Sequence, residues 1–217
     1  MRALPIGWVL PHEQADRRRQ LAITMSRATH ADPPALVAAC VIAACASWTL
    51  ECASPSLLLA VALEAREAAQ TLTTEPRLAE MLAQVSAGRW EPPAKGISLD
   101  PYETVTAALW CATRATSLRS GLVDAVQLGG DTDTVAALVG GLMGCKITAE
   151  QVRAELPWHQ LVVLPEPDSA IAETAYRNCG RYSVSVRLDN PPRQCAVSTG
   201  RHSRRTAVPG ASSMSVS

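Results

Sequence analysis

A helix-start signal occurs three times in this chain and points to a largely helical fold. A residue able to cap a helix stands directly before a proline at Asp32-Pro33, Ser54-Pro55 and Asp100-Pro101. The capping side chain accepts a bond from a free amide of the first turn, and proline suits the first helical position because no N–H is needed there. The three signals predict helices over residues 32–51, 54–70 and 100–114.

The segments between these signals are rich in Ala and Leu, which favour helices, and 47% of all residues are hydrophobic. Further helices are predicted over residues 13–27, 75–87, 117–128 and 133–145. Thr148 and Gln151 form a capping box for a short helix that Pro157 ends or replaces. Residues 1–11 carry no start signal, and no strand-like alternation occurs before residue 176. The predicted fold class is therefore all-α.

The longest apolar run, residues 35–50, is shorter than the roughly 18 residues that a membrane span needs. It contains Ser47 and is predicted to be a buried helix. Pro5, Gly7 and Pro11 stand where a secretory signal has its apolar region, so no such signal is predicted. We therefore expect neither a membrane partner nor secretion.

The seven cysteines are odd in number and show no CxxC spacing, so the sequence indicates neither a zinc site nor a disulfide framework. Cys40, Cys45 and Cys111 lie in apolar helical segments and are expected to pack as small hydrophobic residues. This usage fits a reducing compartment and predicts a cytoplasmic location.

Charge divides the chain into two parts. Residues 1–175 carry 13 basic and 19 acidic side chains, whereas residues 176–217 carry seven Arg and one Asp. The second part lacks hydrophobic periodicity, which is typical of disorder. We predict a helical domain over 1–165 and a linker with a disordered basic tail over 166–217. A solvated tail is the favoured interpretation over contact with nucleic acid or a membrane, and no specific nucleic-acid partner is expected.

Side-chain oxygen is most concentrated in Leu128-Gly129-Gly130-Asp131-Thr132-Asp133-Thr134, between two apolar helical segments. Such a cluster is costly to bury unless a partner satisfies it. Acids two residues apart cannot share a helix face, so one must lie in the turn before the helix. The Gly-Gly pair gives that turn its backbone freedom.

Two interpretations of this cluster stay open on spacing alone. In the first, Asp133 or Thr132 caps the following helix and the second acid is incidental. In the second, the oxygens ligate a hard cation such as Mg²⁺ or Ca²⁺. An EF-hand is excluded, because Val135 and Ala136 stand where that loop needs an oxygen ligand and a glycine.

The sequence LGGDTDTVAALVGGLMG at 128–144 resembles the signature of the ADP-ribosylglycohydrolase family. Other segments agree and follow in the family's order. Met1-Arg2-Ala3-Leu4-Pro5-Ile6-Gly7 resembles an "MR-x-x-P-hydrophobic-G" segment, and Thr29-His30-Ala31-Asp32-Pro33 resembles a "TH-x-D/N-P" turn. Residues 96–109 are similar to the loop and helix before the signature, and Pro157-Trp158 to a closing "I-P-x-x-W" region with altered spacing. The resemblance covers about residues 1–165.

The resemblance implies an all-α fold that holds two Mg²⁺ ions and hydrolyses the glycosidic bond between ADP-ribose and a protein side chain or similar acceptor. The metal ligands that it implies are Asp131, Asp133 and Thr134. The substrate-binding residues that it implies are His30, Gly96, Ile97 and Gly130, and it identifies no catalytic residue. An alternative for His30 is a ring bonded within the turn before a helix.

Members of the family also carry an N-terminal Gly-Asp segment and a Thr-Asp-Asp cluster, which supply the remaining metal ligands. This chain has no Thr-Asp-Asp, and its only Gly-Asp is Gly130-Asp131. We therefore expect the C-terminal portion of such a protein, with an incomplete two-ion site. Three hypotheses follow: an ADP-ribosyl hydrolase, a non-catalytic ADP-ribose-binding module, or a degenerate fragment with uncovered apolar faces at 35–50 and 135–143.

Overall fold

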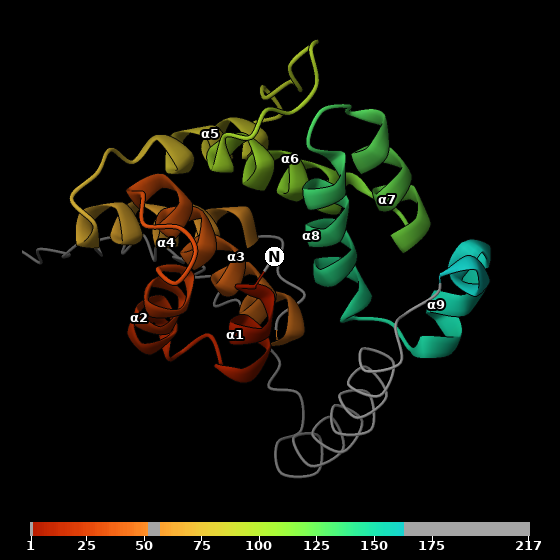
Figure 1. The fold of residues 1–217 in the computed structure, drawn as a ribbon, viewed down its shortest axis with the longest axis horizontal. Helices are drawn as coiled ribbons and strands as arrows, with labels where there is room; N and C mark the ends of the chain where they lie inside the picture. The colour runs from red at the N-terminus through yellow and green to blue at the C-terminus, as the bar shows by residue number, and fades with distance from the viewer. Residues whose placement is uncertain (1, 52–56, 163–217) are drawn as a thin grey trace, which may run out of the picture. The chain divides into compact units, whose positions relative to one another are not determined.

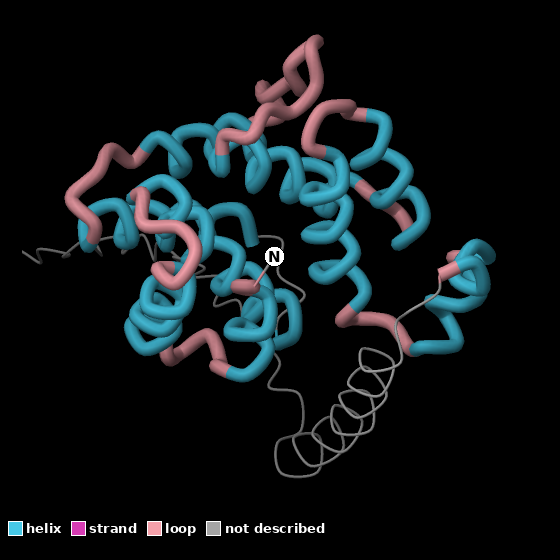
Figure 2. Tube along the Cα trace, viewed as in Figure 1, coloured by secondary structure: helices cyan, strands magenta, loops and turns pink. Residues whose placement is uncertain are grey.

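The computed structural model describes residues 2–51 and 57–162, and these form an all-α protein as predicted (Figures 1 and 2). The helices are, in chain order, α1 Leu4–Val9, α2 Ala15–Ser26, α3 Pro33–Glu51, α4 Leu57–Thr71, α5 Arg77–Ser86, α6 Pro101–Arg114, α7 Leu118–Gln127, α8 Thr132–Gly144, α9 Ala149–Glu155 and the 3-10 helix η1 Pro157–Leu161. Residues 1–161 group into one compact unit. The predicted tail over 166–217 lies outside the described residues, so that boundary stays a prediction.

Several predicted helix starts are confirmed by their bonds. A carboxylate oxygen of Asp32 accepts a first-turn N–H of α3 at 3.2 Å, and one of Asp100 accepts a first-turn N–H of α6 at 2.9 Å. Thr148 and Gln151 form the reciprocal capping box of α9. Ser54 and Pro55 lie outside the described residues. Local sequence therefore sets where these helices begin, because each cap satisfies an amide that the helix leaves free.

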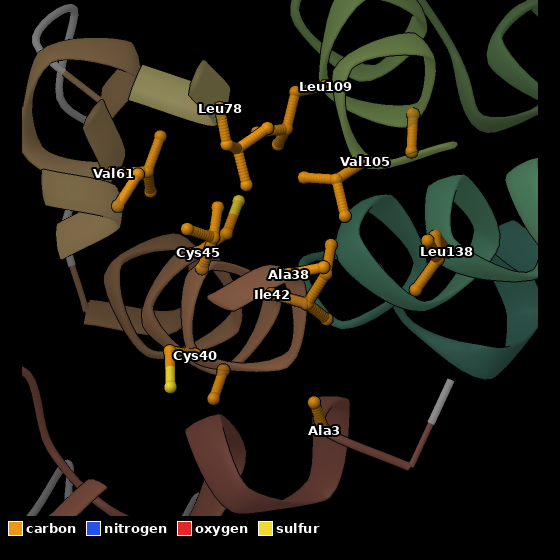
Figure 3. Close-up of a cluster of buried hydrophobic side chains, with 14 of the residues drawn as sticks. Ala3, Ala38, Cys40, Ile42, Cys45, Val61, Leu78, Val105, Leu109 and Leu138 are labelled. Atoms are coloured by element: carbon orange, nitrogen blue, oxygen red, sulfur yellow. The ribbon is translucent and has the colours of Figure 1, made fainter. Parts of the chain in front are cut away.

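Helix α3 is the centre of the core, because α1, α2, α4, α6 and α8 all pack against it. Nearly every side chain from Leu36 to Ala46 is buried. Figure 3 shows residues of α4, α5, α6 and α8, such as Val61, Leu78 and Leu138, gathered around it. The prediction of a buried helix over the long apolar run is confirmed.

Two expectations about this apolar sequence are corrected. The window Pro33–Leu50 is long and apolar enough to cross a membrane by length and composition, but 67% of it is buried inside the protein, as in a core helix. The hypothesis of uncovered apolar faces at 35–50 and 135–143 is also corrected: apart from Leu50, which is 44% exposed, most of these apolar side chains are buried. The apolar face of α8, including Val135, Leu138 and Leu142, is buried against neighbouring helices of this chain.

Helix α1 was not predicted, because residues 1–11 carry no start signal. Its N-cap position makes no side-chain bond, and its formation depends on packing against α3. Gly7 makes this packing possible: a Cβ there would lie 2.1 Å from the carbonyl oxygen of Ala43 and 2.8 Å from the amide nitrogen of Ser47. Tertiary contact therefore overrides weak local propensity in this segment.

The predicted packing of three cysteines is confirmed. Cys40, Cys45 and Cys111 are almost fully buried. Burial raises the pKa of the Cys40 and Cys45 thiols to about 12 and that of Cys111 to about 11. Such thiols stay protonated at neutral pH and act as small hydrophobic side chains.

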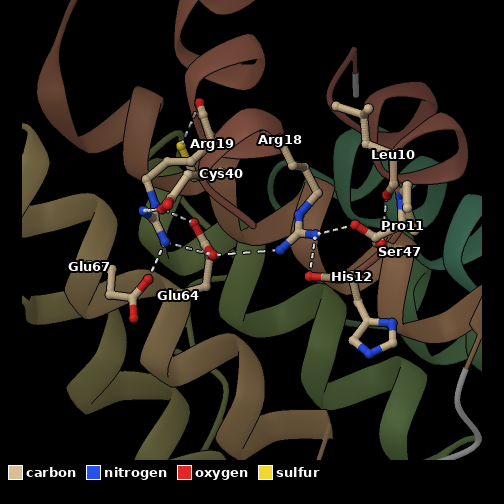
Figure 4. Close-up of polar contacts among 10 residues, drawn as sticks. Leu10, Pro11, His12, Arg18, Arg19, Cys40, Ser47, Glu64 and Glu67 are labelled. Atoms are coloured by element: carbon tan, nitrogen blue, oxygen red, sulfur yellow. Dashed lines mark hydrogen bonds and ion pairs between the residues drawn. The ribbon is translucent and has the colours of Figure 1, made fainter. Parts of the chain in front are cut away.

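A buried ion pair joins α2 to α4 (Figure 4). Arg19 donates to both carboxylate oxygens of Glu64, at 2.7 and 3.1 Å, and also pairs with Glu67. Arg18 lies 3.6 Å from Glu64 and donates to two backbone carbonyls of the α1–α2 loop. Burial by itself lowers the pKa of Arg19, but the bond and charge of Glu64 outweigh it and raise that pKa. The cluster therefore holds α1, α2 and α4 in one arrangement, since breaking one partner would leave a buried charge uncompensated.

We predict that Gly7→Ala destabilises the protein by about 1–3 kcal/mol, because the added Cβ overlaps the backbone of α3. Urea unfolding followed by circular dichroism measures this loss. Gly144→Ala is the matched control, since it ends α8 with no atom within 4 Å of the added Cβ. Equal midpoints for the two variants would contradict the prediction.

Candidate metal site

The turn before α8 has the geometry that its two glycines predict. Gly129 and Gly130 have φ angles of 71° and 76°, in the left-handed region that favours glycine. Asp131 occupies the N-cap position, and Asp133 lies in the first turn of the helix. The two acids are thus divided between turn and helix, as their spacing requires.

The carboxylate of Asp131 is held by two threonine hydroxyls. Thr134 donates to Oδ1 at 2.9 Å, and Thr104 of α6 lies within bonding reach of Oδ2 at 3.4 Å. No side chain at the cap position of α8 bonds to the backbone of its first turn. The interpretation in which Thr132 or Asp133 caps the helix is therefore wrong, because the helix begins at Thr132 and the acid before it binds hydroxyls.

A backbone bridge fixes this turn against the loop before α6. The amide of Ile97 donates to the carbonyl of Gly129 and the amide of Asp131 donates to the carbonyl of Ile97, both at 2.9 Å, in a parallel β-bridge. A Cβ on Gly130 would lie 2.0 Å from the carbonyl oxygen of Ile97, and one on Gly96 would lie 2.6 Å from the backbone of Gly129. Both glycines are required for the two segments to approach this closely.

The structure thus brings three of the predicted substrate-binding residues, Gly96, Ile97 and Gly130, next to Asp131. The Ile97 side chain is only 2% exposed and belongs to the core. The contacts of Ile97 with the turn before α8 are made by its backbone amide and carbonyl. The substrate-binding role of the three residues stays a prediction.

Residues of the first turn of α6 support this arrangement, and no sequence pattern assigned them a role. The carboxylate of Glu103 accepts bonds from the amide and hydroxyl of Ser98, at 3.0 and 2.5 Å, which orders the loop after Ile97. Thr104 reaches Asp131 from 27 positions away. Because no spacing rule connects residues so far apart, the only signal in the sequence was that both segments resemble the same family.

His30 lies exposed in the turn between α2 and α3, and its Nδ1 is 2.9 Å from the hydroxyl of Thr29. This contact matches the alternative of a ring bonded within the turn. Contact between His30 and ADP-ribose stays a prediction.

The donor set suits one hard cation. Asp131 and Asp133 offer carboxylates, and Thr134 gives its proton to Asp131 while its oxygen keeps lone pairs for a ligand. Mg²⁺ in proteins commonly takes one or two carboxylates and retains several waters. Among residues 2–51 and 57–162, no three His, Cys, Asp or Glu side chains converge as a metal site. The described residues therefore do not complete a two-ion site, and binding of one Mg²⁺ by Asp131, Asp133 and Thr134 stays a prediction.

A sequence profile of the ADP-ribosylglycohydrolase family matches residues 1–181. The chain belongs to this family. Its similar curated relatives include ADP-ribosylhydrolase ARH3 of Bos taurus, which is 30% identical over 113 aligned positions. This alignment covers 46% of this chain and 30% of the relative. ADP-ribosylhydrolase ARH3 of Homo sapiens is 28% identical over 113 aligned positions, and this alignment covers 46% of this chain and 31% of the relative. The chain thus spans less than a third of the length of these relatives, and no solved structure matches it.

We predict that Gly130→Ala destabilises the protein by about 2 kcal/mol or more, because the new Cβ overlaps the Ile97 carbonyl in a strained left-handed conformation. Gly88→Ala is the control, since Gly88 has a φ of 67° but no atom within 4 Å of the added Cβ. Urea unfolding of both variants separates backbone strain from the overlap. Equal losses of stability in the two variants would contradict the predicted overlap with Ile97.

Proposed function

We propose that this protein is a Mg²⁺-dependent ADP-ribosyl hydrolase that cleaves the bond between ADP-ribose and a protein side chain or similar small acceptor. The observation that carries the proposal is the Asp131 cluster: a carboxylate held by Thr134 and Thr104 beside an exposed second acid, Asp133, within the family's signature. Membership of the family and the names of the relatives in cattle and humans support the same activity.

In the proposed mechanism, the residues of this chain bind and orient the substrate. Asp131, Asp133 and Thr134 would hold the cation, which would orient the ribose hydroxyls and a water and stabilise the charge that develops as the glycosidic bond breaks. Gly96 and Gly130 let the loop before α6 approach the turn before α8, and this contact holds Asp131 in place beside the substrate. His30 donates a hydrogen bond to the diphosphate of ADP-ribose.

The test is release of ADP-ribose from peptides that carry ADP-ribosyl-serine or ADP-ribosyl-arginine, measured by chromatography with Mg²⁺ and with a chelator. We expect turnover with Mg²⁺ only, and a loss of about a hundredfold or more in Asp131→Asn, because that variant removes a charged ligand. Glu80→Gln, which changes an exposed acid on α5, serves as the control and should keep full activity. No release from either peptide by the intact chain would reject the proposal.

A second candidate is a non-catalytic ADP-ribose-binding module. It is favoured by the small donor set, in which Asp131 and Asp133 are the only acids that the described residues supply at the cluster. Calorimetry with free ADP-ribose distinguishes the two. Heat of binding that is unchanged by a chelator, together with no turnover, is the result expected for a binding module. Absence of heat at millimolar ADP-ribose would reject this candidate.

A cytoplasmic location is also proposed. Cys40, Cys45, Cys111 and Cys145 are free thiols in the described part of the chain. Reducing compartments keep thiols in this form, which supports the proposal.

A further inference from the structure

Thr104 lies in the first turns of α6 with 6% of its surface exposed. Its hydroxyl has two possible acceptors: Oδ2 of Asp131 at 3.4 Å and the carbonyl of Asp100, four residues back in its own helix, at 3.2 Å. A threonine hydroxyl has one proton to donate, so the two acceptors compete for it. The arrangement therefore couples α6 to the acid that precedes α8.

Another buried threonine of α6 shows the geometry of a hydroxyl with a single acceptor. Thr106 donates to the carbonyl of Tyr102 at 2.7 Å. The corresponding distance for Thr104 is longer, at 3.2 Å. The hydroxyl of Thr104 thus lies between two acceptors, 3.2 Å from the carbonyl of Asp100 and 3.4 Å from Oδ2 of Asp131.

We propose that Thr104 is a positioning residue that holds the Asp131 carboxylate in the orientation required for cation binding. This inference rests on the proposed function. Thr134 engages Oδ1, Thr104 engages Oδ2, and the bond from the Asp131 amide to Ile97 holds the main chain. With all three in place the carboxylate cannot rotate freely.

Both oxygens of Asp131 stay available to a cation in this arrangement. Each carboxylate oxygen accepts one hydroxyl and has a further lone pair free. Outer partners that orient a metal ligand commonly change metal affinity ten- to a hundredfold when they are removed. Thr104 acts through Asp131 and touches neither substrate nor ion, so it is not itself a catalytic residue.

The first experiment measures Mn²⁺ binding to the full chain by electron paramagnetic resonance, with Mn²⁺ as the visible substitute for Mg²⁺. Thr104→Val keeps the shape of the side chain and removes its hydroxyl, and we expect about tenfold weaker binding. Thr104→Ser restores the hydroxyl and should restore most of the affinity. Thr106→Val is the matched control, because its hydroxyl is buried on the same helix and bonds only that helix. Equal affinities for Thr104→Val and Thr106→Val would overturn the inference.

The second experiment needs no metal and tests the contact itself. Urea unfolding of Thr104→Val, Asp131→Asn and the double variant gives a double-mutant cycle. We expect a coupling of about fivefold in the unfolding equilibrium constant, and no coupling in the same cycle built with Thr106→Val. Independent effects of Thr104→Val and Asp131→Asn would overturn the inference. A wild-type chain that binds no Mn²⁺ would reject the Mg²⁺-dependent function, while the cycle would still decide whether Thr104 holds the carboxylate of Asp131.

Discussion

The burial of α3 is the constraint on which the rest of the structure depends. A helix this apolar cannot remain in water, and its burial on so many sides requires helices from both ends of the described chain. Helix α1 approaches so closely that its contact residue is Gly7, and α8 covers another side. Once these helices are placed around α3, their ends and loops have little freedom left.

The candidate site lies at one of those helix ends, and backbone hydrogen bonds position most of it. The bridge between Ile97 and the turn at Gly129 and Gly130 positions the main chain of Asp131 before any side chain is considered. The hydroxyls of Thr134 and Thr104 then orient its carboxylate from two helices. A rigid acid beside an exposed one supports the proposed binding of a hard cation, which prefers carboxylate oxygen.

Ion pairs, which differ from the contacts at the candidate site, hold the N-terminal helices together. The buried pair of Arg19 and Glu64, with Arg18 beside it, joins α2 to α4. Desolvation makes such a pair a weak source of stability, but the need to keep both charges paired makes it specific. Together with the core, this ion-pair cluster holds α1, α2 and α4 in one relative arrangement.

Local signals in the sequence determined the helical class, the starts of α3, α6 and α9, and the division of Asp131 and Asp133 between turn and helix. Caps, prolines and glycines act over one or two turns, so their effects can be derived from neighbouring residues. The signature at 128–144 likewise indicated the family from contiguous residues. Only the tertiary structure decided that residues 4–9 form a helix, that Ile97 is bridged to Gly130, and that Thr104 reaches Asp131. These contacts join segments far apart in the chain, and they exist because the packing of α3, α6 and α8 brings them together.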